Sequence, residues 1–407
     1  MRNIYHSDIY KFDTPVNSYW EDTFSENLNL EKLTKDINSE IIVIGGGYTG
    51  LLCAINLIEN HNLDVILVEA GKIGWGASSR NAGFNCLPPS KMSFKKMQSI
   101  FGREETKKFF KNSVEGSNFT RDIIKEYNID CDVTGENNFV VAHHNNKFEQ
   151  IKEQAESYKS EFGIETKIYS KEEFNEIGHG GTEQYGAFSY KPGFAINPLK
   201  FVNGIAKYAL SKKLKIFEHT KVNQIIKENG FYILKTKEGN IRSKKIVVAT
   251  NGFYQEGLIP QMDGRILPVI SNVIVTRKLN EDELNAHNFK TFSPIANTKN
   301  LLYYYRKLPD NRILFGTRGD LTGSDQSNLA MSLKMEKFLK DIFPKWSNVT
   351  IDYNWRGLIA LSQKLTPSIG KIENEEIYYG FGYNGVGVSA APWTGKQLSK
   401  LVFLSNS

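Results

Sequence analysis

Cysteine is scarce in this chain of 407 residues, and its three cysteines, Cys53, Cys86 and Cys131, are widely spaced and form no CxxC pair. Such a set excludes a disulfide framework and a cysteine-based zinc site, and it suits a reducing compartment. No stretch approaches the roughly 18 consecutive apolar residues that a membrane-spanning helix needs. Residues 1–10 also lack the apolar region of a signal peptide, so we expect a cytoplasmic protein without a membrane span.

Clustered positive charge is missing as well. Lys and Arg number 51 against 45 for Asp and Glu, but the basic residues are spread along the whole chain. Nucleic-acid binding would need dense basic tracts with interleaved aromatics, so we expect a solvated, lysine-rich surface and no nucleic-acid partner. The seven histidines have no metal-ligand spacing, and the adjacent His143 and His144 would point to opposite faces of an extended segment. No metal site is expected.

One segment near the N-terminus has the pattern of a strand, a glycine turn, a helix and a second strand. The β-branched run 41–44 leads directly into a GxGxxG loop at 45–50, and apolar residues then recur at helical spacing over 51–58. A second buried-strand run, 65–68, ends at Glu69. These features together form a complete βαβ unit, which is the context that makes the glycine motif specific for a dinucleotide.

Each residue of this unit has a physical role. Gly45 permits the tight turn, Gly47 lets the backbone approach a pyrophosphate, and Gly50 lets the helix pack against the strand. The helix N-terminus offers free N–H groups and positive potential to the phosphates. Glu69 can accept hydrogen bonds from ribose hydroxyls and would repel a 2′-phosphate, which disfavours NADP. The fourth turn of the helix has Asn60-His61-Asn62 in place of a glycine, and asparagine can adopt the left-handed cap conformation instead.

The glycine loop alone does not separate FAD from NAD, but the chain as a whole resembles a known family. The resemblance rests on Ser18-Tyr19-Trp20, the GGGYTGL loop at 45–51, the ASSRNAG segment at 77–83 and the GYNGVGV motif at 382–388. These segments are similar to those of the D-amino-acid-oxidase-like FAD-dependent oxidoreductases, and most of all to the members that oxidise γ-glutamylated amines. The resemblance covers almost the whole chain.

The resemblance implies an α/β (α+β) fold. We expect a discontinuous, Rossmann-like FAD-binding domain and a mixed-sheet substrate domain over the flavin. The implied boundaries are 36–95, 191–258 and 352–407 for the FAD-binding domain, and 96–190 and 259–351 for the substrate domain. Within the FAD-binding domain, separate strands are expected at 241–242 and 246–249.

The C-terminal glycine-rich segment 379–389 precedes a helix, and Pro392 is expected in the first turn of that helix. In the family this helix N-terminus faces the flavin, where it would stabilise negative charge on the reduced ring. Cys86 is the only nucleophile near the flavin motifs, and a buried, unreactive thiol is the more common fate of such a residue. We therefore expect non-covalent FAD.

The expected cofactor contacts come from the motifs and from the segments that follow expected strands. They are Gly45, Gly47, Tyr48, Thr49, Gly50, Glu69, Ala70, Ala77, Ser78, Arg80, Asn81, Ala82, Gly83, Val222, Thr250, Asn251, Gly252, Gly357, Gly382, Tyr383, Asn384, Gly385, Val386 and Gly387.

Aromatic and basic residues mark a candidate substrate cavity. Tyr303 and Tyr305 share one face of an expected strand at 301–306, and Tyr304 lies on the other. The expected substrate contacts are Tyr303, Tyr305, Arg306, Trp355 and Arg356, and Arg318 is a further candidate to hold a carboxylate. Sheet packing for the tyrosines and surface exposure for the arginines are the competing interpretations.

The reaction implied by the resemblance is the oxidation of a C–N bond. Hydride would pass from the amine-bearing carbon of a γ-glutamylated or other carboxylate-bearing amine to flavin N5, and water would hydrolyse the resulting imine to a carbonyl. No catalytic acid or base can be assigned. The electron acceptor is O2 or another oxidant, and an oligomer is possible. The alternatives are a glycine, sarcosine or D-amino acid oxidase or dehydrogenase, a flavin monooxygenase, and a non-catalytic flavin-binding subunit.

Overall fold

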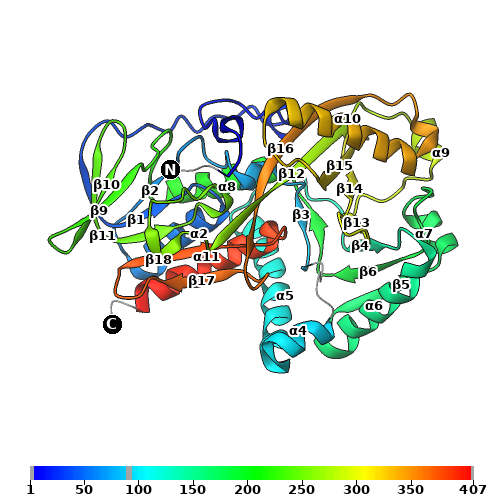
Figure 1. Cartoon of the computed structure of the whole chain (residues 1–407), viewed down its shortest axis with the longest axis horizontal. Helices are drawn as coiled ribbons and strands as arrows, with labels where there is room; N and C mark the ends of the chain where they lie inside the picture. The colour runs from blue at the N-terminus through cyan, green and yellow to red at the C-terminus, as the bar shows by residue number, and fades with distance from the viewer. Residues whose placement is uncertain (1–3, 89–93, 405–407) are drawn as a thin grey trace.

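Two large β-sheets organise the protein, and the computed structural model describes residues 4–88 and 94–404. In Figure 1 the first sheet lies on the left and the second on the right, and α5 descends between them. The helices are α1 (Tyr19–Asp22), α2 (Tyr48–His61), α3 (Ala77–Arg80), α4 (Phe94–Phe101), α5 (Arg103–Glu126), α6 (Phe148–Phe162), α7 (Lys171–Ile177), α8 (Pro198–Ser211), α9 (Glu281–Ala286), α10 (Asp325–Ile342) and α11 (Gly387–Leu404). Short 3-10 helices are η1 (Ser7–Tyr10), η2 (Asn145–Lys147), η3 (Asn251–Phe253), η4 (Pro260–Met262) and η5 (Pro344–Trp346).

The first sheet has the order β17-β18-β11-β1-β2-β8, and β10 and β9 extend it from β11. Its strands are β1 (Ile37–Ile44), β2 (Val65–Val68), β8 (Lys215–Phe217), β9 (Gln224–Glu228), β10 (Phe231–Lys235), β11 (Asn240–Val248), β17 (Ser368–Lys371) and β18 (Ile377–Phe381). The strands β18, β11, β1, β2 and β8 run parallel, and the residues of β2 are buried on both faces. This explains their continuous apolar sequence.

The second sheet has the order β16-β12-β15-β14-β13-β4-β6-β5 and is mixed, because β13 and β4 are parallel and the other pairs are antiparallel. Its strands are β4 (Asn138–Val141), β5 (Glu165–Tyr169), β6 (Ala187–Lys191), β12 (Ile266–Thr276), β13 (Ile295–Asn297), β14 (Tyr304–Lys307), β15 (Ile313–Arg318) and β16 (Ile351–Ser362). A small third sheet pairs β3 (Phe84–Asn85) with β7 (Phe194–Ala195). The expected fold class is confirmed.

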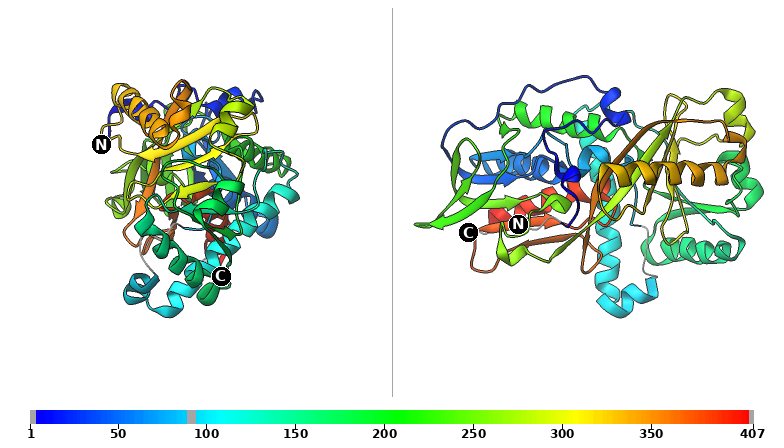
Figure 2. Two further views of the ribbon diagram at one scale, coloured as in Figure 1. Left: turned by 90° about the vertical axis from the view of Figure 1, so that its right-hand side faces the viewer. Right: turned by 45° about the horizontal axis from the view of Figure 1, so that its top comes forward.

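The strands of the first sheet all fall inside the three segments expected for the FAD-binding domain. The long strand β16 follows another course, because it pairs along most of its length with β12 of the second sheet. The boundaries of the two domains stay a prediction. Residues 89–93 and 405–407, which belong to the expected FAD-binding segments, lie outside the described residues. Figure 2 shows the two sheets from two further sides.

One strand differs from the sequence prediction. The chain forms a single strand, β11, where two short strands were expected at 241–242 and 246–249. The polar residues between them fit the strand because they alternate: Ser243 and Lys245 are buried, and Lys244 is exposed. The Ser243 hydroxyl contacts the Lys245 carbonyl, and Lys245 Nζ donates to the Val402 carbonyl (3.2 Å) and lies 3.4 Å from the Glu376 carboxylate. Polar contacts therefore allow Ser243 and Lys245 to be buried at positions where the sequence pattern would lead one to expect apolar residues.

The end of α2 matches the sequence prediction. Asn62 caps the helix in the left-handed conformation, with φ 50° and ψ 40°, and its N–H donates to the Ile58 carbonyl. Asparagine thus takes the position that glycine usually fills, as expected.

Pro392 lies inside α11, not in its first turn as predicted. Proline has no N–H, so the carbonyl of Val388, one turn earlier, loses its helical donor. The buried hydroxyl of Thr120 on α5 lies 3.0 Å from this carbonyl oxygen and 3.1 Å from that of Gly116 in its own helix. A side chain from a neighbouring helix thus supplies the missing donor, which the sequence of α11 alone could not show.

This bond gives a testable coupling between the two helices. Thr120→Val is expected to lower the free energy of unfolding by about 1–2 kcal/mol, because the Val388 carbonyl is left without a donor. The same change should cost less in a Pro392→Ala background, where the introduced alanine supplies the N–H. Denaturant unfolding of the four proteins measures the difference. Ser113→Ala, which removes a hydroxyl bonded only within α5, is the control; equal costs of Thr120→Val in both backgrounds would contradict the assignment.

Among residues 4–88 and 94–404, no helix is both long and apolar enough to cross a membrane.

Candidate functional site

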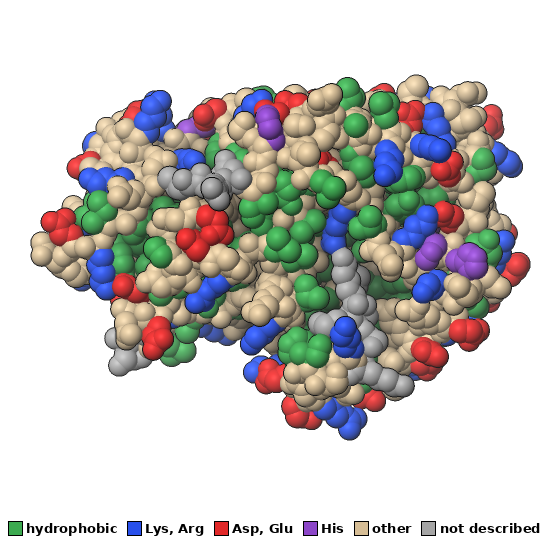
Figure 3. All heavy atoms as spheres, viewed as in Figure 1, with side chains coloured by type: hydrophobic (Ala, Val, Ile, Leu, Met, Phe, Trp, Pro, Cys, Tyr) green, Lys and Arg blue, Asp and Glu red, His purple; other side chains and the backbone are tan. Residues whose placement is uncertain are grey.

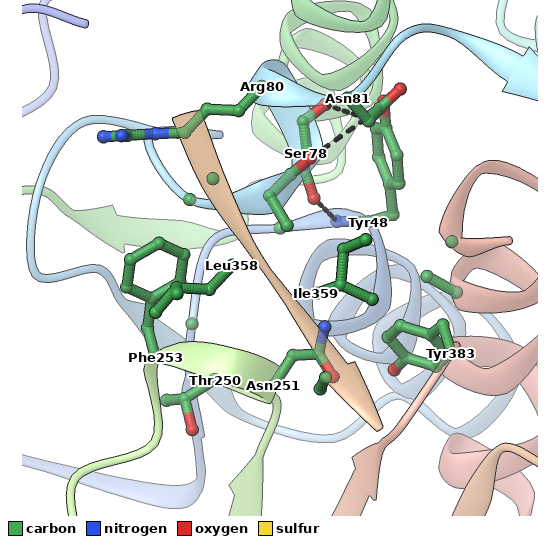
Figure 4. A pocket seen from close by; sticks show the side chains of 18 of the residues that line it. Tyr48, Ser78, Arg80, Asn81, Thr250, Asn251, Phe253, Leu358, Ile359 and Tyr383 are labelled. Carbon is green, nitrogen blue, oxygen red and sulfur yellow. Dashed lines mark hydrogen bonds between the residues drawn. The ribbon is translucent and has the colours of Figure 1, made fainter. Parts of the chain in front are cut away.

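A cavity of about 310 Å³ lies at the carboxyl ends of the central parallel strands and extends to the second sheet. Ile44 at the end of β1, Val68 at the end of β2 and Ala249 just after β11 all line it. This is where ligands bind in open α/β sheets, outside the carboxyl ends of the strands. Figure 4 shows how side chains from α2, α3, β16 and the segments after β11 and before α11 surround one space.

The glycine loop lies at one wall of the cavity, and two of its glycines are required by close packing. Gly45 has φ +116°, and a Cβ on it would lie 2.7 Å from the Ala249 carbonyl oxygen. A Cβ on Gly50 would lie 1.9 Å from the Gly45 carbonyl oxygen. Gly47 is different: it is the N-cap of α2 in extended conformation and caps the helix without a side chain. The N-cap residue itself therefore places no side chain at the first turn of α2, which suits a diphosphate, although Tyr48 N already donates to the Ser78 hydroxyl.

Glu69 is held in one orientation at the end of β2. One carboxylate oxygen accepts from Gly46 N (2.7 Å) and the other from Gly71 N (3.0 Å). Burial raises the pKa of the Glu69 carboxyl, and the hydrogen bonds from backbone N–H groups oppose this shift. Val222 and Ala70 line the same end of the cavity. A carboxylate fixed in this way has lone pairs left for the hydroxyls of a sugar.

Arg80 joins α3 to β16 without an ion pair to any described carboxylate. Its Nε donates to the Trp75 carbonyl (2.7 Å), its Nη1 donates to the Arg356 carbonyl (3.1 Å), and its guanidinium lies 4.0 Å from the centre of the Trp75 ring. Burial lowers the pKa of the Arg80 guanidinium. The neighbouring Ser78 accepts from Tyr48 N (3.1 Å), and this bond ties α3 to the start of α2 (Figure 4).

The segment after β11 faces the C-terminal glycine loop. Asn251 has φ 47°, and its side-chain oxygen accepts from Gly382 N (3.0 Å). Thr250 Oγ1 is buried and has no hydrogen-bond partner in the described part of the chain. A buried hydroxyl without a partner on the wall of a cavity is available to a polar ligand.

The C-terminal loop is tied to both the glycine-loop helix and β16. Tyr383 and Thr49 share a hydroxyl–hydroxyl hydrogen bond of 2.5 Å, and Asn384 N donates to the Ala360 carbonyl (3.1 Å). Gly385 has φ +97°, which brings its backbone to the cavity ahead of the first turn of α11. A second helix N-terminus thus points at the same space, and this favours a ligand that carries or gains negative charge.

Most of the predicted cofactor contacts line this one cavity. They are Gly45, Gly47, Tyr48, Thr49, Glu69, Ala70, Ala77, Ser78, Arg80, Asn81, Ala82, Val222, Thr250, Asn251, Gly357, Tyr383, Asn384, Gly385, Val386 and Gly387. Four predicted glycines, Gly50, Gly83, Gly252 and Gly382, lie behind the wall. A Cβ on Gly83 would lie 1.9 Å from the Ile196 carbonyl oxygen, and one on Gly252 would lie 3.1 Å from Leu358 Cβ, so these positions serve backbone packing.

The two tyrosines that were predicted to contact the substrate point away from the cavity, and the tyrosine between them points into it. Tyr304 lines the cavity, whereas Tyr303 and Tyr305 are buried in the core of the second sheet. Tyr305 shares a 2.8 Å hydrogen bond with the buried His179. Tyr304 can turn to the cavity because it faces Gly316 on β15, where a Cβ would lie 2.0 Å from the tyrosine ring.

Three other predicted substrate contacts also lie away from the cavity. The buried Arg306 donates to the Ile196 carbonyl (2.7 Å), and Trp355 Nε1 donates to the Arg80 carbonyl (2.8 Å). Arg356 pairs with Asp325 (2.8 Å) at the start of α10. Each of these three side chains bonds to a residue that is distant in the sequence. The local sequence pattern therefore could not show that they do not contact the substrate.

Arg318 is the arginine that reaches the cavity at the substrate side. It follows Gly316 by two residues on β15 and so shares the face of Tyr304. Its Nη2 lies 3.3 Å from the position that a Cβ on Gly385 would take. Within the described residues no carboxylate or hydrogen-bond acceptor is paired with it, and burial lowers the pKa of its guanidinium. Arg318 was among the predicted candidates to hold a carboxylate, but the face of β15 that meets the cavity depends on the pairing of this strand with β14.

The wall around Arg318 is mainly apolar and aromatic. It is formed by Phe84, Val273, Ala296, Leu302 and Tyr304, together with Cys86 and Ser271. Burial raises the pKa of the Cys86 thiol to about 12, so the thiol is protonated at neutral pH and is a poor nucleophile. On the face shown in Figure 3, hydrophobic side chains gather over the middle of the molecule, between the parts that hold the two sheets.

Sequence motifs gave no indication of two further parts of the lining. Tyr10 and Phe12 come from the N-terminal segment, and Phe253, Tyr254 and Leu258 come from the end of η3 and the chain that follows it. None of them belongs to a recognisable pattern.

Comparisons with known proteins agree with this architecture. The chain matches the family model described as FAD dependent oxidoreductase (DAO) over residues 40–401. It is 28% identical over 388 residues to the gamma-glutamylputrescine oxidoreductase of Escherichia coli (strain K12), covering 95% of this chain and 89% of that relative. It is 23% identical over 377 residues to the glycine oxidase of Bacillus subtilis (strain 168), covering 89% and 92%. The crystal structure of glycine oxidase from Geobacillus kaustophilus superposes with a TM-score of 0.73 at 17% identity, covering 90% and 95%.

These findings confirm the resemblance that the motifs indicated. The matched region includes strands of both sheets and all of the strands around the cavity except the first three residues of β1. The chain belongs to the DAO family of FAD-dependent oxidoreductases, whose members act on amines and amino acids.

Proposed function

We propose that the protein oxidises the C–N bond of an amine that also carries a carboxylate. The observation that supports this proposal is Arg318, a guanidinium without an ion pair or hydrogen bond among the described residues, in an otherwise apolar part of the cavity beside Gly385. Arg318 is partly buried, and an unpaired cation in an apolar surrounding is costly unless a ligand neutralises it. A substrate carboxylate is the partner that a planar guanidinium binds best, through two parallel hydrogen bonds.

We infer a place for each part of FAD from the residues that line the cavity. The glycine loop and the start of α2 would hold the pyrophosphate, Glu69 and Val222 the adenosine, and Thr250 with residues 383–387 the ring end. The bound cofactor supplies the two-electron acceptor. The thiol pKa of Cys86 supports a non-covalent cofactor, because a thiolate is needed to form a bond to the flavin.

The residues at the substrate end would position the substrate and exclude water. Arg318 would fix the carboxylate, while Leu302, Val273 and Tyr304 surround the carbon chain. An apolar wall favours the neutral amine over the ammonium ion, so a strong base is not required. Among the described lining residues the only carboxylate is Glu69, at the far end of the cavity. Positioning would therefore provide most of the rate acceleration.

The relatives suggest which amines to test first. The names of two of them refer to gamma-glutamylputrescine and to glycine, and both compounds carry a carboxylate. We propose a γ-glutamylputrescine-like amine as the first candidate and glycine or another amino acid as the second.

Anaerobic mixing of the purified holoprotein with paired amines tests the proposal. The pairs are glycine against methylamine, which lacks only the carboxylate, and γ-glutamylputrescine against putrescine, which lacks the whole γ-glutamyl group with its carboxylate. We expect the flavin absorbance to bleach with at least one carboxylate-bearing amine and at least about 10 times more slowly with its partner, a difference of about 1.4 kcal/mol. Bleaching by NADPH alone, with none of the amines active, would overturn the proposal and favour a monooxygenase.

A further inference from the structure

The N-terminal segment lies outside the matched family model, which begins at residue 40, yet it contributes to the cavity. Residues 5–14, here called the N-terminal strap, run between the second sheet and the loop that follows β2. Two of their side chains, Tyr10 and Phe12, line the cavity. In Figure 1 this dark blue part of the chain lies at the top, between the two halves of the molecule.

The first half of the strap is anchored on the second sheet. Ile9 is 1% exposed and packs with Ile270 on β12 and Leu358 on β16. The Tyr5 hydroxyl donates to the Pro268 carbonyl (2.8 Å), and His6 N donates to the Thr322 carbonyl (2.8 Å). Ile9 is the buried anchor of this half, whereas His6 and Ser7 are exposed.

The second half of the strap rests on the wall of the cavity. The Phe12 ring lies 4.7 Å from the Trp75 ring, and the Tyr10 ring lies 6.5 Å from the Phe253 ring, measured between ring centres. Trp75 Nε1 donates to the Thr14 carbonyl (3.0 Å). Trp75 and Phe253 also line the cavity, so the two strap rings extend the aromatic wall on this side.

A cluster of charges fixes the middle of the strap to α10. The Asp8 carboxylate accepts from Asp325 N (3.0 Å) at the start of that helix and pairs with Lys11 (2.8 Å). Asp325 in turn lies 3.5 Å from Lys11 and 2.8 Å from Arg356. We call these four residues the latch. The Lys11 and Asp325 side chains are largely exposed, at 49% and 71%, so salt should weaken the latch.

We propose that the N-terminal strap is part of the cofactor site and that its displacement controls the release of FAD. Tyr10 and Phe12 cover the cavity beside the Glu69–Trp75 loop, and the latch holds them there. A ligand that spans the cavity from Glu69 to Gly385 cannot leave on this side while the two rings stay in place. The strap should therefore slow cofactor release independently of the substrate.

The rate of FAD release from the holoprotein tests this inference. After dilution, the recovery of free-flavin fluorescence gives the dissociation rate constant. We expect the double variant Tyr10→Ala with Phe12→Ala to release FAD about 10-fold faster or more. The reason is that the variant loses the apolar contacts of both aromatic rings at the cavity. Lys11→Met should release it about 2- to 5-fold faster, as befits an exposed ion pair. Lys152→Met, which breaks a comparable surface pair with Glu149 on α6, should leave the rate unchanged.

Salt provides a second, independent measurement. Release from the unmodified protein should accelerate between low and high ionic strength, and this dependence should be smaller in Lys11→Met. The unfolding midpoint of each apoprotein separates an effect on the site from a loss of fold. Release rates within twofold of the unmodified protein for the ring variant, with an unchanged apoprotein midpoint, would overturn the inference. If the ring variant does not fold, an equal salt dependence in Lys11→Met and the unmodified protein would do so.

Discussion

Replacing Gly47 with leucine is expected to give a folded but colourless protein. The residue has an extended conformation (φ −90°, ψ −175°), which any L-amino acid adopts, and a Cβ would meet only the small Ser78 side chain, with the hydroxyl at 2.7 Å. The new side chain would occupy the approach to the first turn of α2, where the diphosphate binds. We expect FAD affinity to fall by at least about 100-fold, or about 3 kcal/mol.

Two matched glycine variants make this result specific. Gly50→Leu should prevent folding, because its Cβ would lie 1.9 Å from the Gly45 carbonyl oxygen in a fully packed turn. Gly163→Asn should change neither the fold nor the flavin content, since Gly163 caps α6 at φ +65° with open space around it. Circular dichroism and the flavin-to-protein absorbance ratio measure both properties. A Gly47→Leu protein that retains its full flavin content would contradict the assignment of the phosphate site.

Replacing Arg318 with methionine is expected to reduce kcat/KM for a carboxylate-bearing substrate by about 100- to 1000-fold. The reason is that the carboxylate would enter an apolar cavity without a partner, which costs about 3–4 kcal/mol. Arg318→Lys should recover only part of this loss, because an ammonium group cannot form the paired hydrogen bonds of a guanidinium. The matched amine that lacks the carboxylate should be affected much less.

Steady-state kinetics with each pair of amines measures this difference, and the flavin content of each variant is the control. If Arg318→Met lowered kcat/KM equally for both members of a pair, the arginine would act on the cofactor or the fold. The role in carboxylate binding would then be wrong.

The sequence could predict the part of the site that is formed by one continuous segment of the chain. The run from Ile41 to Glu69 contains a strand, a turn, a helix, a strand and an acid in consecutive positions, and each is specified by its own residues. Gly50 is required by its contact with Gly45 in the same turn, whereas the close contact of Gly45 is with Ala249, just after the paired strand β11. Local rules therefore sufficed for the first wall of the cavity.

The substrate side could not be predicted in this way. Alternation along residues 303–305 correctly separates Tyr304 from Tyr303 and Tyr305, but it does not say which face meets the cavity. That choice depends on Gly316, which lies on the paired strand. Pro392 is a similar case, because the donor that makes it tolerable in mid-helix is Thr120 on α5. The strap could not be predicted either, since Tyr10 and Phe12 belong to no motif.

The position of β1 has a consequence for synthesis on the ribosome. One edge of β1 pairs with β2 soon after both strands emerge, but the other edge pairs with β11, where Ile44 lies opposite Val248. The next strand, β18, ends only at Phe381. A nascent chain therefore carries an open, apolar strand edge over about half of its translation. The pairing of β11 closes this edge of β1, but residues 246–248 of β11 then lack their own neighbour until β18 is made, so chaperone dependence should end only after Phe381 has left the ribosome.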